Sequence, residues 1–421
     1  MELYDHQKEA LMVTASRNRV AYYHDMGLGK TFTGAEKMKD LGCDLNLVVC
    51  QKSKVDDWIE HFRTNYAEWF VYNLTSERDY TDFIMDLWPP KYRPMVGVIN
   101  YDLIFRRPEL KKLSEFTLLL DESSMVKNET AKRSKFILKT EPKNVILLSG
   151  TPTGGKYEEL WSQMHLLGWN ISKKLFYNQY IEYHWDDQDG FPRMVIDGYK
   201  NEERLKRKMR EHGCHFLKTG DVFDLPEQVH QWVMVKPAKE YRKFRDTSIC
   251  TIGDDQLVGD NILTQLLYER QLCGHYSESK LEAFQDLLES TNDRLIVFYN
   301  FKAELSRLLE ITQESGRPCS MVNGDQKDLT AYEKFSDSVT FIQYQAGAMG
   351  LNLQKANKIV YFTPTLSSEL FEQSKKRIHR IGQDRTCFYY YLTCKPSVEQ
   401  HIYRVLKMRR NYTEALFEQG A

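Results

Sequence analysis

The sequence lacks the patterns that mark several large classes of protein. Its eight cysteines form no Cys-x-x-Cys pair and no Cys/His cluster with zinc spacing, which favours scattered reduced thiols over a zinc module. No apolar run approaches the ~20 residues that a membrane-spanning helix needs. The first residues, MELYDHQKEA, are charged and contain no apolar stretch, so we expect no signal peptide and a cytoplasmic protein.

The chain also lacks an excess of charge of either sign. Its 58 basic and 59 acidic residues give a formal net charge of -1, whereas a protein that binds nucleic acid by bulk charge would be basic. Any contact with a phosphate backbone must therefore come from local clusters of Lys and Arg. The length of 421 residues suggests two or three domains, and 42% hydrophobic residues can fill more than one core.

Short apolar runs alternate with helical patterns in the first 170 residues. Four runs have the length and composition of buried strands, and between them lie helical patterns such as VDDWIEHF (55–62). The runs are NLVVC (46–50), MVGVIN (95–100), FTLLLDE (116–122) and NVILLSG (144–150). This alternation predicts an α/β lobe over 1–170, with a parallel sheet covered by helices.

The alternation weakens over 171–275 and then returns. We interpret 171–275 as a helical protrusion and linker, in which NEERLKRKMREHG (201–213) is a basic surface helix. A second set of strands follows and predicts a second α/β lobe over 276–421 that ends in a long helix (398–419). Its strands are RLIVFYN (294–300), VTFIQY (339–344), KIVYF (358–362) and CFYYYL (387–392).

A glycine-rich segment, HDMGLGKT (24–31), lies between an apolar run and a helical pattern. Gly27 and Gly29 allow backbone N–H groups to approach phosphates, Lys30 can reach the β- and γ-phosphates of ATP, and the Thr31 hydroxyl can bind Mg²⁺. His24 stands where a complete phosphate-binding motif has its first glycine. The alternative is a glycine-rich helix start with an exposed lysine.

Two carboxylates, Asp121 and Glu122, end the apolar run LLLDE. Asp121 can hold Mg²⁺, directly or through water, and Glu122 can orient and deprotonate an attacking water. An acidic strand end beside a turn is common, but its place about 90 residues after the glycine-rich segment, within one α/β pattern, favours the catalytic interpretation.

The segment QSKKRIHRIGQ (373–383) supplies two arginines in the second lobe. Arg377 and Arg380 are three residues apart, so they share one face if the segment is helical. A guanidinium brought to the γ-phosphate from the opposite lobe would stabilise the charge of the transition state. The alternative is a solvated basic helix.

Taken together, these motifs resemble a known family. DMGLGKT, DESS followed by MVKN, LSGTP, GAMGLNL and RIHRIGQ occur in the order typical of superfamily 2 helicases, and DMGLGKT and HRIGQ resemble the SWI/SNF-type ATPases. The resemblance implies two RecA-like lobes with a helical insertion between them, ATP with Mg²⁺ as cofactors, and nucleic-acid-dependent ATP hydrolysis.

The resemblance also implies roles for individual residues. Gln7 matches the glutamine that recognises adenine, and LSGTP matches the motif that couples the ATP site to nucleic acid. The predicted nucleotide contacts are Gln7, Met26, Gly27, Leu28, Gly29, Lys30, Thr31, Gly350, Asn352 and Arg380. The predicted nucleic-acid contacts are Lys52, Ser53, Asn100, Tyr101, Gln345 and Gly347.

This sequence departs from the family pattern at several positions. The acidic motif is DESS, so Ser124 replaces the usual histidine and cannot link the ATP site to LSGTP in the same way. The chain is short and shows no chromodomain, bromodomain or nuclease motif. It resembles a minimal bacterial or phage-type member.

We therefore expect an ATP-dependent motor that translocates along DNA, duplex more than single-stranded, with backbone contacts and little sequence preference. The alternatives are a strand-separating helicase in phage DNA replication or repair, an RNA-dependent ATPase, and an inactive nucleic-acid-binding module. Protein partners and oligomeric state do not follow from the sequence.

Overall fold

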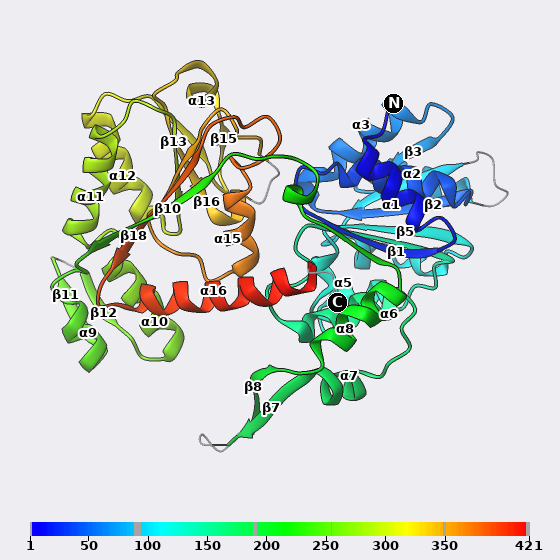
Figure 1. Ribbon diagram of the computed structural model, residues 1–421, viewed down its shortest axis with the longest axis horizontal. Coiled ribbons are helices and arrows are strands. Elements are labelled where there is room, and N and C mark those ends of the chain that lie inside the picture. The colour runs from blue at the N-terminus through cyan, green and yellow to red at the C-terminus, as the bar shows by residue number, and fades with distance from the viewer. Residues whose placement is uncertain (1, 88–93, 188–191, 254, 348–350, 418–421) are drawn as a thin grey trace. The chain divides into compact units, whose positions relative to one another are not determined.

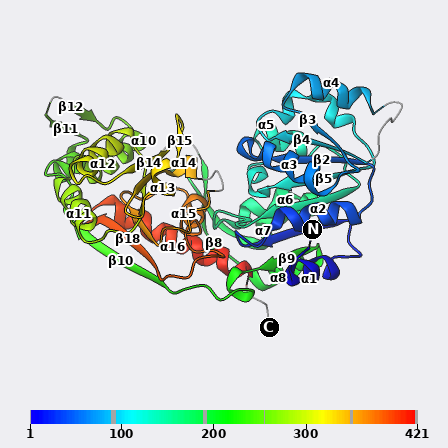
Figure 2. The same cartoon turned by 90° about the horizontal axis from the view of Figure 1, so that it is seen from above.

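The computed structural model describes residues 2–87, 94–187, 192–253, 255–347 and 351–417, and the chain forms two compact units. Unit 1 is residues 1–222 with 411–421, and unit 2 is residues 223–410. Each unit has one large sheet with helices on both faces (Figures 1 and 2). The division differs from the three parts expected above, with its main boundary at Val222 rather than near 170 and 275.

The sheet of unit 1 has seven strands, all parallel to their neighbours. In spatial order they are β3 (Phe70–Asn73), β4 (Met95–Asn100), β2 (Leu45–Cys50), β5 (Phe116–Asp121), β6 (Asn144–Ser149), β1 (Arg19–His24) and β9 (Cys214–Leu217). The four strands predicted for this lobe are confirmed to within two residues at each end.

Alternate residues of these strands face two separate cores. Val20, Tyr22, Val48 and Leu119 pack with α1 (Asp5–Val13), α2 (Lys30–Asp40) and α3 (Val55–Asn65). Their neighbours in sequence, such as Ala21 and Leu118, pack on the other face with the remaining helices. These are α4 (Glu77–Met85), α5 (Lys132–Ile137), α6 (Trp161–Leu166), α7 (Lys173–Tyr180) and α8 (Glu202–Glu211).

The sheet of unit 2 also has seven strands, all parallel except the last pair. Their order is β10 (Gln228–Val235), β18 (Cys387–Cys394), β17 (Lys358–Tyr361), β13 (Leu295–Tyr299), β16 (Val339–Gln343), β14 (Cys319–Val322) and β15 (Lys327–Asp328). The main helices of this part are α9 (Tyr241–Thr247), α10 (Ile262–Cys273), α11 (Glu278–Glu289), α12 (Lys302–Glu314), α13 (Thr330–Lys334), α15 (Ser368–Lys375) and α16 (Val398–Phe417).

The segment 171–275 contains helices α7 to α10, but it is not helical throughout. It also contains a hairpin of β7 (Ile181–Asp186) and β8 (Arg193–Tyr199), a second hairpin of β11 (Ile249–Ile252) and β12 (Asp255–Val258), and one edge strand of each large sheet, β9 and β10. Helix α8 is not a surface protrusion, because Leu205 and Met209 are fully buried in unit 1.

The sequence predicts reduced cysteines and no membrane-spanning helix, and both expectations can be compared with the structure. All eight cysteines are free thiols, seven of them buried and Cys319 half-buried. Within the ranges described, no helix combines the length and the apolar content that crossing a bilayer requires.

Candidate functional site

The loop between β1 and α2 adopts a backbone that glycine favours. Gly27 has φ 88° and Gly29 has φ 70°, and Gly29 precedes the first turn of α2. A Cβ on Gly29 would lie 2.3 Å from Gln7 Nε2, so a larger residue would be obstructed as well as strained. The loop therefore leads directly to a helix N-terminus, where unsatisfied N–H groups and the helix dipole attract anions.

His24 is the last residue of β1 rather than the first residue of this loop. It is fully buried, and its Nε2 lies 2.8 Å from Nδ1 of His215 on β9. Burial, with a smaller effect of His215, holds the pKa of His24 well below its ordinary value. Its place in the strand explains why the motif tolerates histidine where a glycine is usual.

Gln7 supports the loop from α1. Its Nε2 donates to the Gly29 carbonyl at 3.0 Å and more weakly to that of Leu28 at 3.4 Å, and its Oε1 accepts from Tyr4 N at 2.9 Å. Gln7 is only 2% exposed. Both ends of the amide are thus bonded to protein, which gives Gln7 a structural role here, while adenine recognition stays a prediction.

Lys30 folds back over the start of the loop. Its Nζ donates to the carbonyls of His24 at 2.8 Å and Asp25 at 3.0 Å. A Cβ on Gly150, which follows β6, would lie 3.5 Å from the same Nζ and 3.4 Å from Cγ of Met26. The ammonium therefore lies between the ends of β1 and β6, beside the half-buried Thr31 of α2.

Asp121 and Glu122 follow at the end of β5, beside β6 in the sheet. Asp121 Oδ2 accepts from the Trp58 indole Nε1 at 2.8 Å. Burial raises the pKa of the Asp121 carboxyl, against the lowering effects of the Trp58 hydrogen bond and the Lys30 charge. Glu122 has a left-handed backbone, φ 58°, which a non-glycine residue adopts only where its surroundings stabilise it.

Two serine hydroxyls bind the Glu122 carboxylate. Ser124 Oγ donates to Oε1 at 3.1 Å, and Ser149 Oγ donates to the same atom at 2.6 Å. Ser149 belongs to the LSGTP motif and also accepts from Thr151 N at 3.1 Å. The link expected of a histidine at position 124 is therefore made directly, by a serine on each side of the carboxylate.

A buried glutamine ties the surrounding backbone together. Gln163 of α6 accepts from Ser123 Oγ at 2.8 Å and from the Tyr23 hydroxyl at 3.0 Å, and its Nε2 donates to the Pro152 carbonyl at 2.7 Å. It thus connects β1 with the segments that follow β5 and β6. Both the oxygen and the nitrogen of the Gln163 side-chain amide therefore have hydrogen-bond partners.

The carboxyl ends of β5, β6 and β1 form one site, because these strands are adjacent and parallel. They bring together Lys30, Asp121, Glu122 and Ser149 around the N-terminus of α2. An ammonium and open helix N–H groups suit a polyphosphate, and a carboxylate and a hydroxyl are ligands that Mg²⁺ accepts. The described residues of unit 1 therefore fit the predicted nucleotide and metal.

The predicted nucleic-acid contacts of unit 1 divide into two groups. Lys52 and Ser53 are exposed in the 3₁₀ turn η1 (Lys52–Lys54) after β2, at the same end of the sheet. Asn100 ends β4 and is 7% exposed. Tyr101 is 1% exposed, and its hydroxyl donates to the Asp121 carbonyl at 3.0 Å. The Tyr101 side chain therefore supports the end of β5, and a contact of this residue with nucleic acid stays a prediction.

In unit 2 the arginine motif is not helical. Helix α15 ends at Lys375, so the argument that Arg377 and Arg380 share a helix face is wrong. Arg377 is buried, 4% exposed, whereas Arg380 is partly exposed and its Nη1 donates to Oδ1 of Asn352. Burial lowers the pKa of Arg380 from its ordinary value. The two predicted nucleotide contacts Asn352 and Arg380 are thus neighbours.

The other motif residues of unit 2 lie after β16. Gln345 is exposed, and Gly347 is buried where a Cβ would meet Ile342 Cγ2 at 3.0 Å and Phe298 Cε1 at 3.1 Å. Packing alone therefore accounts for glycine at position 347. Gly350 lies outside the described residues.

Three residues of the site were not identified from the sequence: Trp58, Ser149 and Gln163. Trp58 has the spacing of a core residue, and nothing in the helical pattern indicates that its N–H reaches Asp121. Ser149 lies within LSGTP, so its motif was recognised and its partner was not. Gln163 is a polar residue in the buried face of α6, which is the one local pattern that could have identified it.

Two family models match this chain. The SNF2-related domain matches residues 6–278, and the helicase conserved C-terminal domain matches residues 279–382. The SWI/SNF-related regulator of chromatin subfamily A-like protein 1 of Xenopus tropicalis is 24% identical over 95% of this chain and 43% of its own length. YwqA of Bacillus subtilis is 24% identical over 74% of this chain and 36% of its own length.

A solved structure, the Sulfolobus solfataricus SWI2/SNF2 ATPase core in complex with dsDNA, aligns with a TM-score of 0.45 at 18% identity, over 98% of this chain and 92% of that one. This chain covers less than half of the length of either relative above. The match to the SNF2-related domain covers well over half of this chain. The chain belongs to the SNF2-related family and carries a helicase C-terminal domain after it.

Proposed function

We propose that this chain is an ATPase that uses hydrolysis to move along duplex DNA. The observation that carries the proposal is the single site at the ends of β1, β5 and β6, where Lys30, Asp121 and Glu122 meet. Membership of the SNF2-related family gives this site its expected chemistry. The names of the relatives, a chromatin regulator among them, agree with a DNA substrate.

Residues of unit 1 hold the nucleotide and its metal. Backbone N–H groups of Gly27, Gly29 and the first turn of α2 bind phosphate oxygens, and Lys30 turns from the His24 and Asp25 carbonyls toward them. Thr31 and Asp121 bind Mg²⁺, which when present neutralises charge on the phosphates. Met26 and Leu28 shape the loop.

Glu122 positions and deprotonates the attacking water. Ser124 and Ser149 both donate to its Oε1 and so hold the carboxylate in place for this role. Arg380 of unit 2 supplies positive charge to the γ-phosphate during hydrolysis, and Arg377 and Asn352 position that segment. The nucleotide thus makes different contacts before and after hydrolysis, and this difference drives movement.

DNA contacts the exposed Lys52 and Ser53 of unit 1 and Gln345 of unit 2. Such backbone contacts carry little sequence information. The discriminating experiment measures ATP hydrolysis with no nucleic acid, single-stranded DNA, duplex DNA and RNA of equal length. We expect duplex DNA to stimulate most. Equal rates in all four would remove the translocase proposal, and no hydrolysis in any would support an inactive binding module.

Strand separation is a second candidate function, and one feature of unit 1 favours it. Figure 1 shows β7 and β8 extending from α7 as a hairpin. Trp185 pairs with Met194 across it, and they are 63% and 37% exposed. The base is held by Tyr199, whose ring stacks on Tyr157 at 4.4 Å. A projecting aromatic residue can separate base pairs by stacking.

The charge of this hairpin opposes that role. Its described residues include three carboxylates, those of Glu182, Asp186 and Asp197, and one strong base, Arg193. This excess of negative charge would repel the phosphates of DNA. Translocation without strand separation is therefore the first proposal. Displacement of the third strand of a triplex, without separation of a forked duplex, supports it. Separation of the fork that is lost in Trp185→Ala supports the hairpin as a wedge.

A further inference from the structure

The sheet of unit 1 has an open edge at β9. Among the described residues, β1 is the only strand that pairs with β9. The carbonyls of Gly213 and Leu217 accept from Ala21 N at 3.0 Å and Asp25 N at 2.9 Å, so these residues face β1. Because alternate residues of a parallel strand face the same neighbour, the N–H and C=O groups of Cys214 and Phe216 face away from the sheet.

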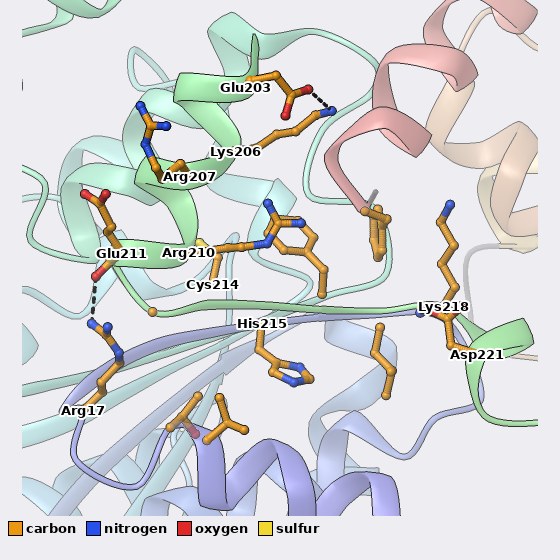
Figure 3. A pocket seen from close by; sticks show the side chains of 16 residues that line it. Arg17, Glu203, Lys206, Arg207, Arg210, Glu211, Cys214, His215, Lys218 and Asp221 are labelled. Carbon is orange, nitrogen blue, oxygen red and sulfur yellow. Dashed lines mark hydrogen bonds and ion pairs between the residues drawn. The ribbon is translucent and has the colours of Figure 1, made fainter. Parts of the chain in front are cut away.

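A groove with a volume of about 1220 Å³ follows this edge. Its floor is β9, one wall is α8, and the opposite wall is the end of α1 at Val13 and Thr14, with Phe417 of α16 also in the lining. Figure 3 shows β9 crossing the groove, with Arg210 on the side of α8 and His215 on the opposite side. Cys214 is 5% exposed and Phe216 is half-buried, so the edge is more accessible at Phe216.

The walls of the groove are mainly basic. Arg17, Lys206, Arg207, Arg210 and Lys218 line it, against the carboxylates of Glu203, Glu211 and Asp221. Two of these carboxylates are paired with lysines of the same helix, Glu203 with Lys206 at 2.7 Å and Glu211 with Lys208 at 2.6 Å. Arg17 and Arg207 are exposed at the surface. Outside these pairs, the exposed Arg17 and Arg207 and the half-buried Lys218 outnumber Asp221.

The floor also offers apolar surface. The Phe216 ring lies 5.2 Å from that of Phe417 and 5.4 Å from the Arg210 guanidinium. Val13 is 60% exposed on the opposite wall. An extended chain beside β9 would place alternate side chains against these two surfaces.

We propose that this groove binds an extended acidic peptide segment of a partner protein as an additional strand on β9. The outward N–H and C=O groups of Cys214 and Phe216 require a ligand that both accepts and donates, which a peptide backbone does and a phosphodiester does not. The basic walls select Glu or Asp on that segment. The groove shares no residue with the proposed nucleotide site, so the two functions can be tested separately.

Three fluorescein-labelled peptides test the proposal by anisotropy with the full chain. The first alternates Glu and Val over ten residues, the second replaces each Glu by Lys, and the third is the first with every amide N-methylated. We expect only the first to bind. N-methylation removes backbone donors and keeps charge, so equal binding of the third peptide would overturn strand addition. Preference for the Lys peptide would overturn the charge argument.

Two variants on the exposed surface of α8 localise the binding. Arg207 lines the groove, whereas Arg204 is an exposed residue of the same helix outside it. We expect Arg207→Glu to weaken the acidic peptide about tenfold and Arg204→Glu to change its affinity less than about twofold. Circular dichroism confirms that both variants are folded. Equal effects of the two substitutions on peptide affinity would overturn the assignment of this groove as the peptide site. A loss of duplex DNA binding in Arg207→Glu alone would also overturn it, because the groove would then bind nucleic acid.

Discussion

The two units have the same architecture but use their buried polar groups differently. In unit 1 one network of hydrogen bonds lies at the ends of β1, β5 and β6, around Glu122 and Lys30. In unit 2 the most buried ion pair is structural: Lys280 Nζ lies 2.7 Å from Glu399 and also donates to the Phe362 carbonyl at 3.0 Å. The network of unit 1 is the one to which we assign the chemistry, and the ion pair of unit 2 holds α11 and α16 on the sheet.

The first prediction tests the chemical network of unit 1. Lys30→Ala should lower the rate of ATP hydrolysis by about 10⁴-fold or more, because no other cation of the loop reaches the phosphates. Its folding stability should be preserved, since Lys30 is only partly buried. Lys39→Ala, at the exposed end of the same helix, is the control and should hydrolyse ATP normally. Wild-type turnover in Lys30→Ala would refute the assignment of this loop.

The second prediction tests the contribution of Arg380, a residue of unit 2, to ATP hydrolysis. Arg380→Ala should lower turnover by about 10³-fold while a fluorescent ATP analogue binds with nearly unchanged affinity. The control is Arg385→Ala, since Arg385 is exposed and donates to the Lys355 carbonyl at 2.8 Å. A parallel loss of nucleotide affinity in Arg380→Ala would show that this arginine holds the ground state instead.

The third prediction tests the structural network of unit 2. Lys280→Met should destabilise the protein by about 3–5 kcal/mol in urea unfolding, because Glu399 is left buried without its partner. Lys280→Met with Glu399→Leu should recover much of that loss. Lys302→Met, which breaks the exposed pair of Lys302 and Asp325 at 3.1 Å, should leave the urea midpoint unchanged. Similar midpoints for the two single variants would contradict the structural role.

The smallest predicted effect on ATP hydrolysis concerns the two serine hydroxyls that bind the Glu122 carboxylate. Ser149→Ala should lower turnover about tenfold, because Glu122 loses its shorter hydroxyl bond. Ser124→Ala removes the longer bond and should cost less. Steady-state ATPase assays at saturating ATP compare the two. A larger loss in Ser124→Ala would reverse the ranking that these distances give.

The sequence predicted the core strands well because their patterns are local. Runs such as FTLLLDE are buried on both faces, so each residue is apolar and the run is continuous. Strand β10 was missed because it is an edge strand whose residues are half-exposed or exposed. The hairpin of β7 and β8 was missed for the same reason, since its stability comes from cross-strand pairs and from Tyr199 at its base.

The predicted site residues differ in the same way, because local patterns located some of them and not others. Residues fixed by their own loop or strand, such as Gly29 and Asp121, lie where the motif suggested. Arrangements that depend on another element were harder to predict: the arginine segment is not helical because α15 ends at Lys375, and the Tyr101 hydroxyl bonds the backbone at the end of β5. Donors such as Trp58 and Ser149 come from separate elements, and periodicity gives no information about such pairings.

The two hydroxyls that hold Glu122 have one more consequence. A serine hydroxyl neither gains nor loses a proton between about pH 5 and pH 9, whereas a histidine in its place would change charge within that range. The two donors that hold the Glu122 carboxylate are therefore uncharged, and they do not titrate over this range. A relative with histidine at position 124 would have a donor there that itself changes charge with pH.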